Sequence, residues 1–289
     1  MPSRQQIRSR IRSVTSTKQI TRAMQMVSAS KLRRAQAAVN RPRLYSDVAR
    51  EMLTSLRQLA QAQGGHELFR DRVVKKRLLI VIGSNRSLAG AYNANILREL
   101  IRQIRSDEAA GIQTGVICVG RQIARAAVRL KGVEIVGVYN DLPDQPGPMT
   151  LQPILVSAFE DFTEDGLDQA DMLYTVFHST IKQTVQVDRL LPAGFVDMPL
   201  DDDLRHVEIE PSLEELIDVT VVRFLSAQLQ QAYLDAVASE HAIRMLAMKN
   251  ATDNANDIID DLTLEFNNAR QAAITQELSE ISAGVEALD

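Results

Sequence analysis

The residues best placed to do chemistry lie in a glycine-containing turn, GSNRSLAGAYN, at residues 83–93. The turn follows the apolar run RLLIVI at 77–82 and leads into a helical pattern. In a doubly wound fold, this is where backbone amides bind nucleotide phosphates. Neither G-x-G-x-x-G nor G-x-x-x-x-G-K-[ST] is present, so the phosphate-binding glycines and lysine of those motifs are missing. We therefore interpret the segment as a structural strand-to-helix turn, with a nucleotide site as the alternative.

Other catalytic or metal-binding groups are scattered along the sequence. The four histidines are widely separated, and none has a cysteine or carboxylate at metal-ligand spacing: His66, His178, His206 and His241. A carboxylate cluster near the end of the chain fits a solvated helix face better than an acid/base pair: Asp257, Asp260, Asp261 and Glu265. The sequence thus predicts no catalytic residue, no metal site and no cofactor.

The single cysteine, Cys118, lies in the apolar run TGVICV, which predicts a buried strand residue. One cysteine can form neither an intrachain disulfide nor a cysteine metal cluster, and this fits a reducing compartment. No stretch reaches the roughly 20 apolar residues needed to cross a bilayer. Membrane contact is therefore expected only through partners.

Two long, glycine-poor ends flank a glycine-rich middle, because 12 of the 13 glycines lie between Gly64 and Gly194. Apolar residues at three- and four-residue steps predict one helix over about 3–59 and another from about 213 to the end. At 1.5 Å per residue these helices would be roughly 85 and 110 Å long. Such helices cannot hide an apolar stripe alone, so we expect them to pair antiparallel.

The predicted seam of this coiled coil mixes large and small side chains, and its named members are Ile7, Ile11, Val14, Ile258 and Leu262. Charge favours the pairing as well. Residues 1–50 carry 12 Lys/Arg and one Asp/Glu, a net +11, whereas residues 201–289 carry five and 19, a net −14. Exposed ion pairs each contribute only about 0 to 1 kcal/mol, so the apolar seam must supply most of the stability.

Between the two helices, short apolar runs alternate with helical patterns. Strands are predicted at 77–82, 114–119, 133–138, 172–177 and 184–191, and helices near 93–105, 121–131 and 151–162. This order predicts a mostly parallel, Rossmann-like α/β domain, followed by an acidic connector at 197–211. The expected division is an N-terminal coiled-coil helix at 1–60, the α/β domain at 61–210 and a C-terminal coiled-coil helix at 211–289.

Two other function classes fit part of this pattern. The arginine-rich start could bind nucleic acid, as in a helical scaffold, but it lacks interleaved aromatic residues and any reader fold. An α/β enzyme would need a catalytic constellation that the sequence does not offer. Complementing an acidic partner accounts for the basic residues without nucleic acid.

The two ends carry a family resemblance. IRSRIRSVTSTKQITRAMQMVSASKLRRAQ at 7–36 closely resembles the start of F-type ATP synthase gamma subunits, and SEHAIRMLAMKNATDNANDIIDDLTLEFNNARQAAITQELSEI at 239–281 is similar to their terminal signature. The family's usual turn G-L-C-G-x-[FY]-N is SLAGAYN here, with Ser87 and Ala89 as departures. The chain lacks the cysteine-bearing insertion of chloroplast members, and its immediate start favours a bacterial subunit.

The resemblance implies a non-catalytic central-stalk rotor that couples proton flow to ATP synthesis or hydrolysis on beta subunits. The implied partners are the alpha and beta subunits of the catalytic head, the epsilon subunit and the c-subunit membrane ring. The implied location is the cytoplasmic face of the bacterial cell membrane, as a peripheral protein. The resemblance also implies contacts between rotor and head, at Arg8, Arg10, Met24, Arg244, Gln271, Thr275 and Glu277.

Overall fold

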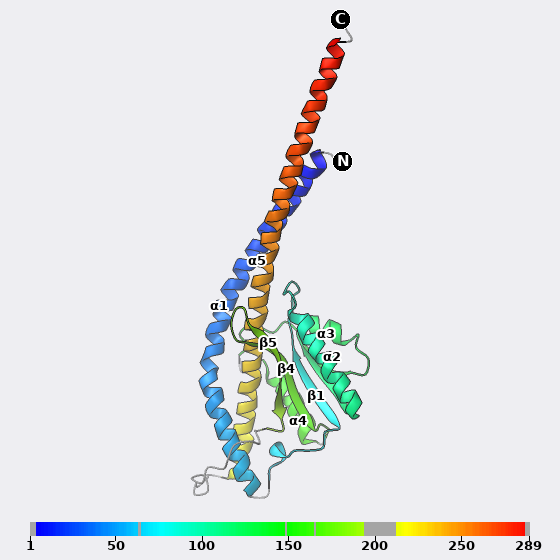
Figure 1. Cartoon of the computed structure of the whole chain (residues 1–289). Helices are drawn as coiled ribbons and strands as arrows, with labels where there is room; N and C mark the ends of the chain where they lie inside the picture. The colour runs from blue at the N-terminus through cyan, green and yellow to red at the C-terminus, as the bar shows by residue number, and fades with distance from the viewer. Residues whose placement is uncertain (1–3, 63–64, 148, 165, 194–211, 287–289) are drawn as a thin grey trace. The chain divides into compact units, whose positions relative to one another are not determined.

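The computed structural model describes the backbone of residues 4–62, 65–147, 149–164, 166–193 and 212–286, and their side chains except at 40–51, 62, 280 and 282–286. The acidic connector expected at 197–211 lies outside the described residues. The chain divides into two compact units, Met1–Ala29 with Arg244–Asp289, and Ser30–Ile243. Two long helices, α1 (Arg4–Ala62) and α5 (Leu213–Glu286), contribute to both units (Figure 1). The sequence predicted both helices to within a few residues.

The unit Ser30–Ile243 contains a five-stranded sheet in the order β3-β2-β1-β4-β5. The strands are β1 (Lys76–Ile82), β2 (Gln113–Val119), β3 (Glu134–Tyr139), β4 (Gln169–Phe177) and β5 (Gln183–Leu191). Strands β1 to β4 run parallel, and β5 pairs antiparallel with β4. The expected mostly parallel α/β fold is therefore confirmed.

Three helices connect the parallel strands, namely α2 (Tyr92–Ala110), α3 (Arg121–Ala127) and α4 (Gln152–Thr163), and a short 3-10 helix, η1 (Glu67–Phe69), precedes β1. Strands parallel to β1 lie on both sides of it, and right-handed crossovers therefore place α2 and α3 on one face and α4 on the other. The second predicted helix is shorter than expected, since α3 ends at Ala127 rather than near residue 131.

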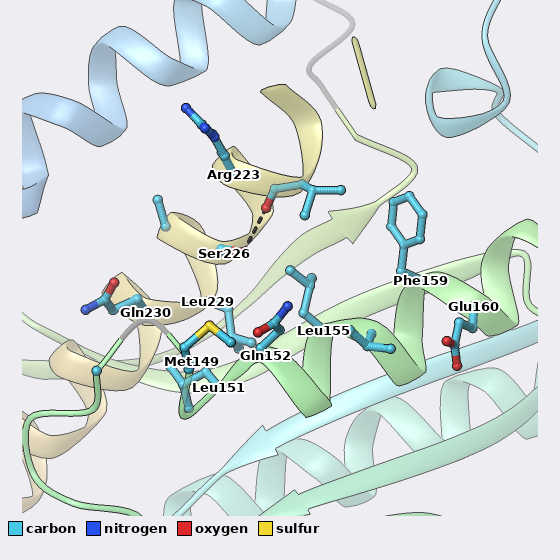
Figure 2. Close-up of a pocket in the computed structure, with 14 residues that line it drawn as sticks. Met149, Leu151, Gln152, Leu155, Phe159, Glu160, Arg223, Ser226, Leu229 and Gln230 are labelled. Atoms are coloured by element: carbon cyan, nitrogen blue, oxygen red, sulfur yellow. Dashed lines mark hydrogen bonds between the residues drawn. The ribbon is translucent and has the colours of Figure 1, made fainter. Parts of the chain in front are cut away.

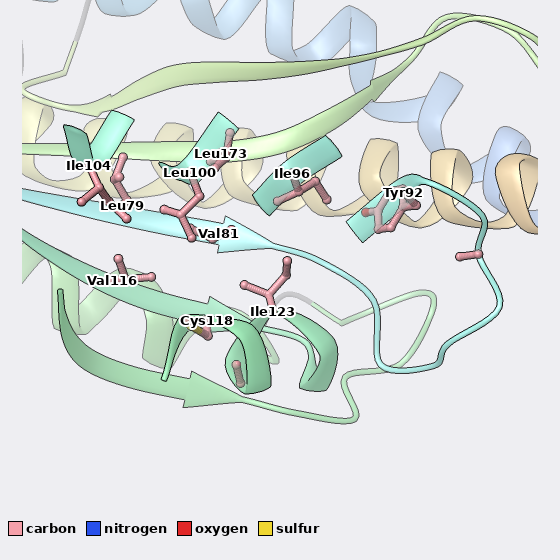
Figure 3. Packing of buried hydrophobic residues seen from close by; sticks show 13 residues of the cluster. Leu79, Val81, Tyr92, Ile96, Leu100, Ile104, Val116, Cys118, Ile123 and Leu173 are labelled. Carbon is pink, nitrogen blue, oxygen red and sulfur yellow. The ribbon is translucent and has the colours of Figure 1, made fainter. Parts of the chain in front are cut away.

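The core on the face of α2 and α3 is built from side chains two residues apart on the strands and about one turn apart on the helices (Figure 3). Helix α2 contributes Ile96, Leu100 and Ile104 at four-residue steps, which is the apolar stripe of an amphipathic helix. These side chains pack on Leu79 of β1 and on Cys118 of β2. This packing holds β1 in place, and the turn at 83–93 follows the carboxyl end of that strand.

Candidate functional site

The two chain ends form an antiparallel helical pair in the unit Met1–Ala29 with Arg244–Asp289. The Thr21 and Thr252 hydroxyls lie 2.8 Å apart in a buried hydrogen bond. Farther along, Arg4 Nη2 lies 3.6 Å from Glu277 Oε1. Residue numbers rise along α1 while they fall along α5, so the predicted antiparallel pairing is present.

The seam of this pair follows a heptad rhythm. Buried or half-buried side chains recur at alternating steps of four and three residues on both helices, namely Ile7, Ile11, Val14, Lys18, Thr21, Gln25 and Ser28 on α1, and Met245, Met248, Thr252, Ala255, Ile259, Leu262 and Phe266 on α5. With Thr21 opposite Thr252, the same steps bring Ile11 level with Leu262 and Val14 level with Ile259. The predicted seam members Ile7, Ile11, Val14 and Leu262 lie in this series.

Ile258 is the exception among the predicted seam residues. Its side chain is 47% exposed, and Ile259 occupies the seam position instead. The prediction put Ile258 on one face with Leu262, four residues later. The observed seam instead reaches Leu262 by a step of four from Ala255 to Ile259 and a step of three from Ile259.

The residues expected to contact the head fall into three exposure classes. Arg8, Arg10, Gln271, Thr275 and Glu277 are exposed, Met24 is half-buried, and Arg244 is only 6% exposed. Five of the seven residues are thus accessible on the surface of the pair. Arg244 is largely buried within the chain itself.

Two exposed apolar stripes on the pair were not anticipated from the sequence. On α1, Ile20 and Val27 are 58% and 57% exposed and flank Met24 at i, i+4 and i+7 spacing. Near the end of α5, large exposed apolar residues repeat the same spacing, at Ile274, Leu278 and Ile281. The sequence does contain a signal for these stripes, namely a second set of apolar residues at helical spacing beside the seam residues. Exposed stripes of this kind mark surfaces that a partner covers.

The turn after β1 is closed by its own side chains. The Ser84 amide donates to Asn93 Oδ1 at 3.1 Å, and Asn93 Nδ2 donates to Ser84 Oγ at 2.7 Å. Asn85 Oδ1 accepts the backbone amides of Arg121 and Asp141, at 3.2 and 3.1 Å. The Ser84 amide and the side chains of Asn85 and Asn93 are therefore already bonded within the protein, and this favours the structural interpretation.

A pocket of about 600 Å³ opens between α4 and α5 in the unit Ser30–Ile243 (Figure 2). Its lining is mainly apolar and includes Leu155, Phe159 and Leu229, with Glu160 and Arg223 as its charged members. One carboxylate and one guanidinium do not make a nucleophile, an acid/base pair or an oxyanion site. The pocket can accept an apolar group but offers no catalytic machinery.

A buried charged cluster lies at the amino end of β1. Arg77 bonds Asp107 Oδ1 at 3.0 Å and Asp171 Oδ2 at 2.5 Å, at the amino end of β1. Burial raises the pKa of the Asp171 carboxyl, and the positive charge of Arg77 opposes that rise. Burial also raises the pKa of Cys118 to about 11. Among the described residues, no cluster of three or more His, Cys, Asp or Glu side chains could hold a metal ion.

Every helix within the described part of the chain is too short or too polar to span a membrane.

Comparison with known proteins agrees with this architecture. A family model described as ATP synthase matches residues 3–288. The ATP synthase gamma chain of Chloroflexus aurantiacus is 40% identical over 290 residues, covering 100% of this chain and 99% of the relative. That of Staphylococcus saprophyticus is 38% identical over 294 residues, covering both chains completely.

Solved structures share the fold. A chain of the Euglena gracilis mitochondrial ATP synthase (OSCP/F1/c-ring, rotational state 3) gives a TM-score of 0.69 at 20% identity, covering 98% of this chain and 93% of that chain. A chain of the Tetrahymena thermophila mitochondrial ATP synthase (central stalk/c-ring) gives 0.61 at 24% identity, covering 80% and 99%. From the span of the family model and the full-length identity to these relatives, the chain belongs to the family of ATP synthase gamma chains.

Proposed function

We propose that this chain is the central-stalk rotor of an F-type ATP synthase, coupling proton flow through a membrane ring to ATP synthesis or hydrolysis in a catalytic head. The observation that carries the proposal is the antiparallel helical pair at the chain ends, with a heptad seam inside and exposed apolar stripes outside. The full-length relatives named gamma chains support the same assignment.

The helical pair suits a shaft turning inside a ring of partner subunits. Its outer surface differs around the circumference, with the apolar stripe of Ile20, Met24 and Val27 on one helix and the polar residues Gln271, Thr275 and Glu277 on the other. An asymmetric shaft touches each of three surrounding beta subunits differently. Rotation then shifts each beta site between states, because the contacts stabilise the states unequally.

We assign ATP chemistry to the beta subunits and a non-catalytic role to this chain. The hydrogen-bonded turn after β1 and the mainly apolar lining of the pocket between α4 and α5 support this assignment of roles. A rotor has to transmit force and change contacts, and neither task requires a nucleophile or a bound nucleotide.

The proposed partners are the alpha and beta subunits around the helical pair, and the epsilon subunit and c-subunit ring on the membrane side. The chain would then be a peripheral protein at the cytoplasmic face of a bacterial membrane, held there by these partners. The solved relatives described with a c-ring and a central stalk support this placement.

Rotation can be tested directly on the assembled complex. Ile181→Cys places a thiol in the exposed β4–β5 turn, where a bead can be attached, while Cys118 is buried and its pKa is raised. With the head fixed to glass, ATP should turn the bead in one direction in steps of about a third of a turn, because the three beta subunits hydrolyse ATP one after another. The matched control carries Cys118 alone and should bind no bead. A complex that hydrolyses ATP while the attached bead stays still would refute the proposal.

A further inference from the structure

A short loop after β3, residues 142–146, contacts both long helices within the unit Ser30–Ile243. The loop presents the Asp144 carboxylate between them. Asp144 Oδ2 lies 2.8 Å from Lys31 Nζ on α1 and 3.3 Å from His241 Nε2 on α5. A single carboxylate oxygen therefore joins the two helices through the α/β domain.

The loop backbone is held as well. The Tyr233 hydroxyl of α5 lies 3.1 Å from the carbonyl oxygen of Pro143 and 3.3 Å from that of Leu142. The Gln145 side-chain amide donates to the carbonyl oxygen of Arg34 on α1 at 3.4 Å. These bonds fix where Asp144 sits, so its position does not depend on its ion pair alone.

The neighbours of Asp144 favour the charged form of its carboxylate and keep it hydrogen-bonded. The hydrogen bond from His241, followed by that from Lys31, holds the pKa of the Asp144 carboxyl well below its usual range, although burial opposes the shift. His241 and Tyr233 are buried, whereas Lys31 is half-buried. A charge-assisted bond to a buried imidazole is stronger and more directional than an exposed ion pair.

Within the unit Ser30–Ile243, Lys31 lies beside a stripe of buried side chains on α1, and His241 belongs to a similar stripe on α5. Leu32, Ala35 and Val39 on α1 are buried at steps of three and four residues, as are Leu234, Ala238 and His241 on α5. Alanine at two of these positions leaves little apolar area to resist sliding. A slip of one residue moves a helix by about 1.5 Å, which is enough to break a hydrogen bond near 3 Å.

We propose that Asp144 is a positioning residue that fixes the register of α1 against α5, so that torque applied to the α/β domain reaches both helices together. The inference rests on the proposed rotor function. The α/β domain has other bonds to single long helices. Tyr92 Oη of α2 donates to the carbonyl of Ala236, and Ser239 Oγ donates to the carbonyl of Thr175 in β4. Each of those bonds engages α5 alone, whereas Asp144 engages both helices.

The first test measures the register in the isolated full chain. Spin labels at Arg33→Cys and Arg223→Cys, on exposed sites of α1 and α5, report the distance between the helices. Asp144→Ala should broaden or shift the distance distribution, and Asp144→Glu should largely restore it. Arg102→Ala is the matched control, because it removes an exposed ion pair with Glu99 that lies within α2 alone.

The second test measures coupling in membrane vesicles that contain the complete complex. Proton pumping per ATP hydrolysed should fall about twofold to fivefold in Asp144→Ala, the range expected from losing a partly exposed ion pair. It should be unchanged in Arg102→Ala. The double variant Lys31→Ala with Asp144→Ala should be no worse than Asp144→Ala, because both changes break the same bridge.

The outcomes separate the two proposals. Unchanged label distances in Asp144→Ala, or changed distances with an unchanged pumping ratio, would overturn the positioning role while leaving the rotor intact. A parent complex whose pumping does not depend on this chain would instead overturn the rotor function. The spin-label measurement would still decide whether Asp144 fixes the helix register.

Discussion

At the scale of single residues, Cys118 is the only thiol of the chain and lies in the core beneath α2 and α3. With its pKa raised to about 11, the native thiolate fraction at about pH 8 should be about two orders of magnitude below that of a free cysteine. We predict negligible labelling by a maleimide in the native chain and complete labelling in guanidinium chloride. Ile181→Cys should react quickly in the native chain. Rapid native labelling of Cys118 would contradict its burial.

Met24 lies half-buried on α1, between the exposed Ile20 and Val27. A flexible apolar side chain there can slide past a changing partner surface. In Met24→Lys, we expect the new charge to pair with acidic groups of the proposed beta-subunit partner and so to favour one rotational angle. A preference of about 1.4 kcal/mol would change the population of that angle tenfold. We predict that ATP synthesis and proton pumping fall more than ATP hydrolysis.

Vesicles that hold the complete complex provide the measurement for Met24, with synthesis and pumping each normalised to hydrolysis by the same preparation. Met24→Leu is the control, because it keeps an apolar side chain of similar volume. Equal ratios in Met24→Lys and the parent, with assembly intact, would remove Met24 from the coupling surface.

At the scale of elements, the helices and strands were predictable because their apolar patterns are long and regular. The periodic run beginning at Ile7 locates α1, and RLLIVI locates β1. Local pattern could not decide between Ile258 and its neighbour Ile259, since both are apolar and either could continue a three-and-four rhythm. Packing against the partner helix decides which of the two is buried, and the apolar pattern of one helix does not show where the partner helix lies.

This difference makes a paired prediction for the seam. Leu262→Asp places a charge against Ile11 at the level of the pairing and should destabilise the pair by about 1 to 3 kcal/mol. Ile258→Asp changes an exposed position and should stay within about 0.5 kcal/mol of the parent. Circular dichroism during urea unfolding gives both values. Equal losses in the two variants would mean that the seam runs elsewhere.

The bridges between elements were less predictable than the elements. Asp144 lies 113 positions after Lys31 and 97 before His241, and no periodicity connects such distant positions. The structural interpretation of the turn after β1 rested on the absence of phosphate-binding motifs, and it stays a prediction. The hydrogen bonds that Asn85 and Asn93 accept from backbone amides became visible only in three dimensions.

At the scale of the whole molecule, the uneven distribution of glycine pointed to two helical ends around a compact middle. The family signature occupies those ends, at 7–36 and 239–281, and the contacts implied for Arg244 and Glu277 remain predictions. Contact with a head or a ring is a property of an assembly. Neither the sequence pattern nor the fold of one chain contains the partner surfaces.

We predict that the purified chain neither hydrolyses ATP nor binds it in the micromolar range. In the turn at 83–93, the Ser84 amide donates to Asn93 Oδ1 and Asn85 Oδ1 accepts the amides of Arg121 and Asp141. No phosphate-binding lysine accompanies the turn. Calorimetric titration with ATP and a phosphate-release assay give the measurements, and the reconstituted complex serves as the active control. Stoichiometric binding to the isolated chain that is lost in Asn93→Ala would place a nucleotide site at this turn.

The heptad seam of the paired ends has a mechanical consequence. A repeat of 3.5 residues per turn winds two helices around each other in a left-handed supercoil, and the layers from Ile7 to Ser28 keep this repeat throughout. Torque in one direction winds a left-handed supercoil more tightly, and torque in the other direction unwinds it. The stiffness of this pair should therefore depend on the direction of torque. Torque that tightens the winding presses Thr21 onto Thr252, whereas the opposite torque separates these small, polar layers and meets less resistance.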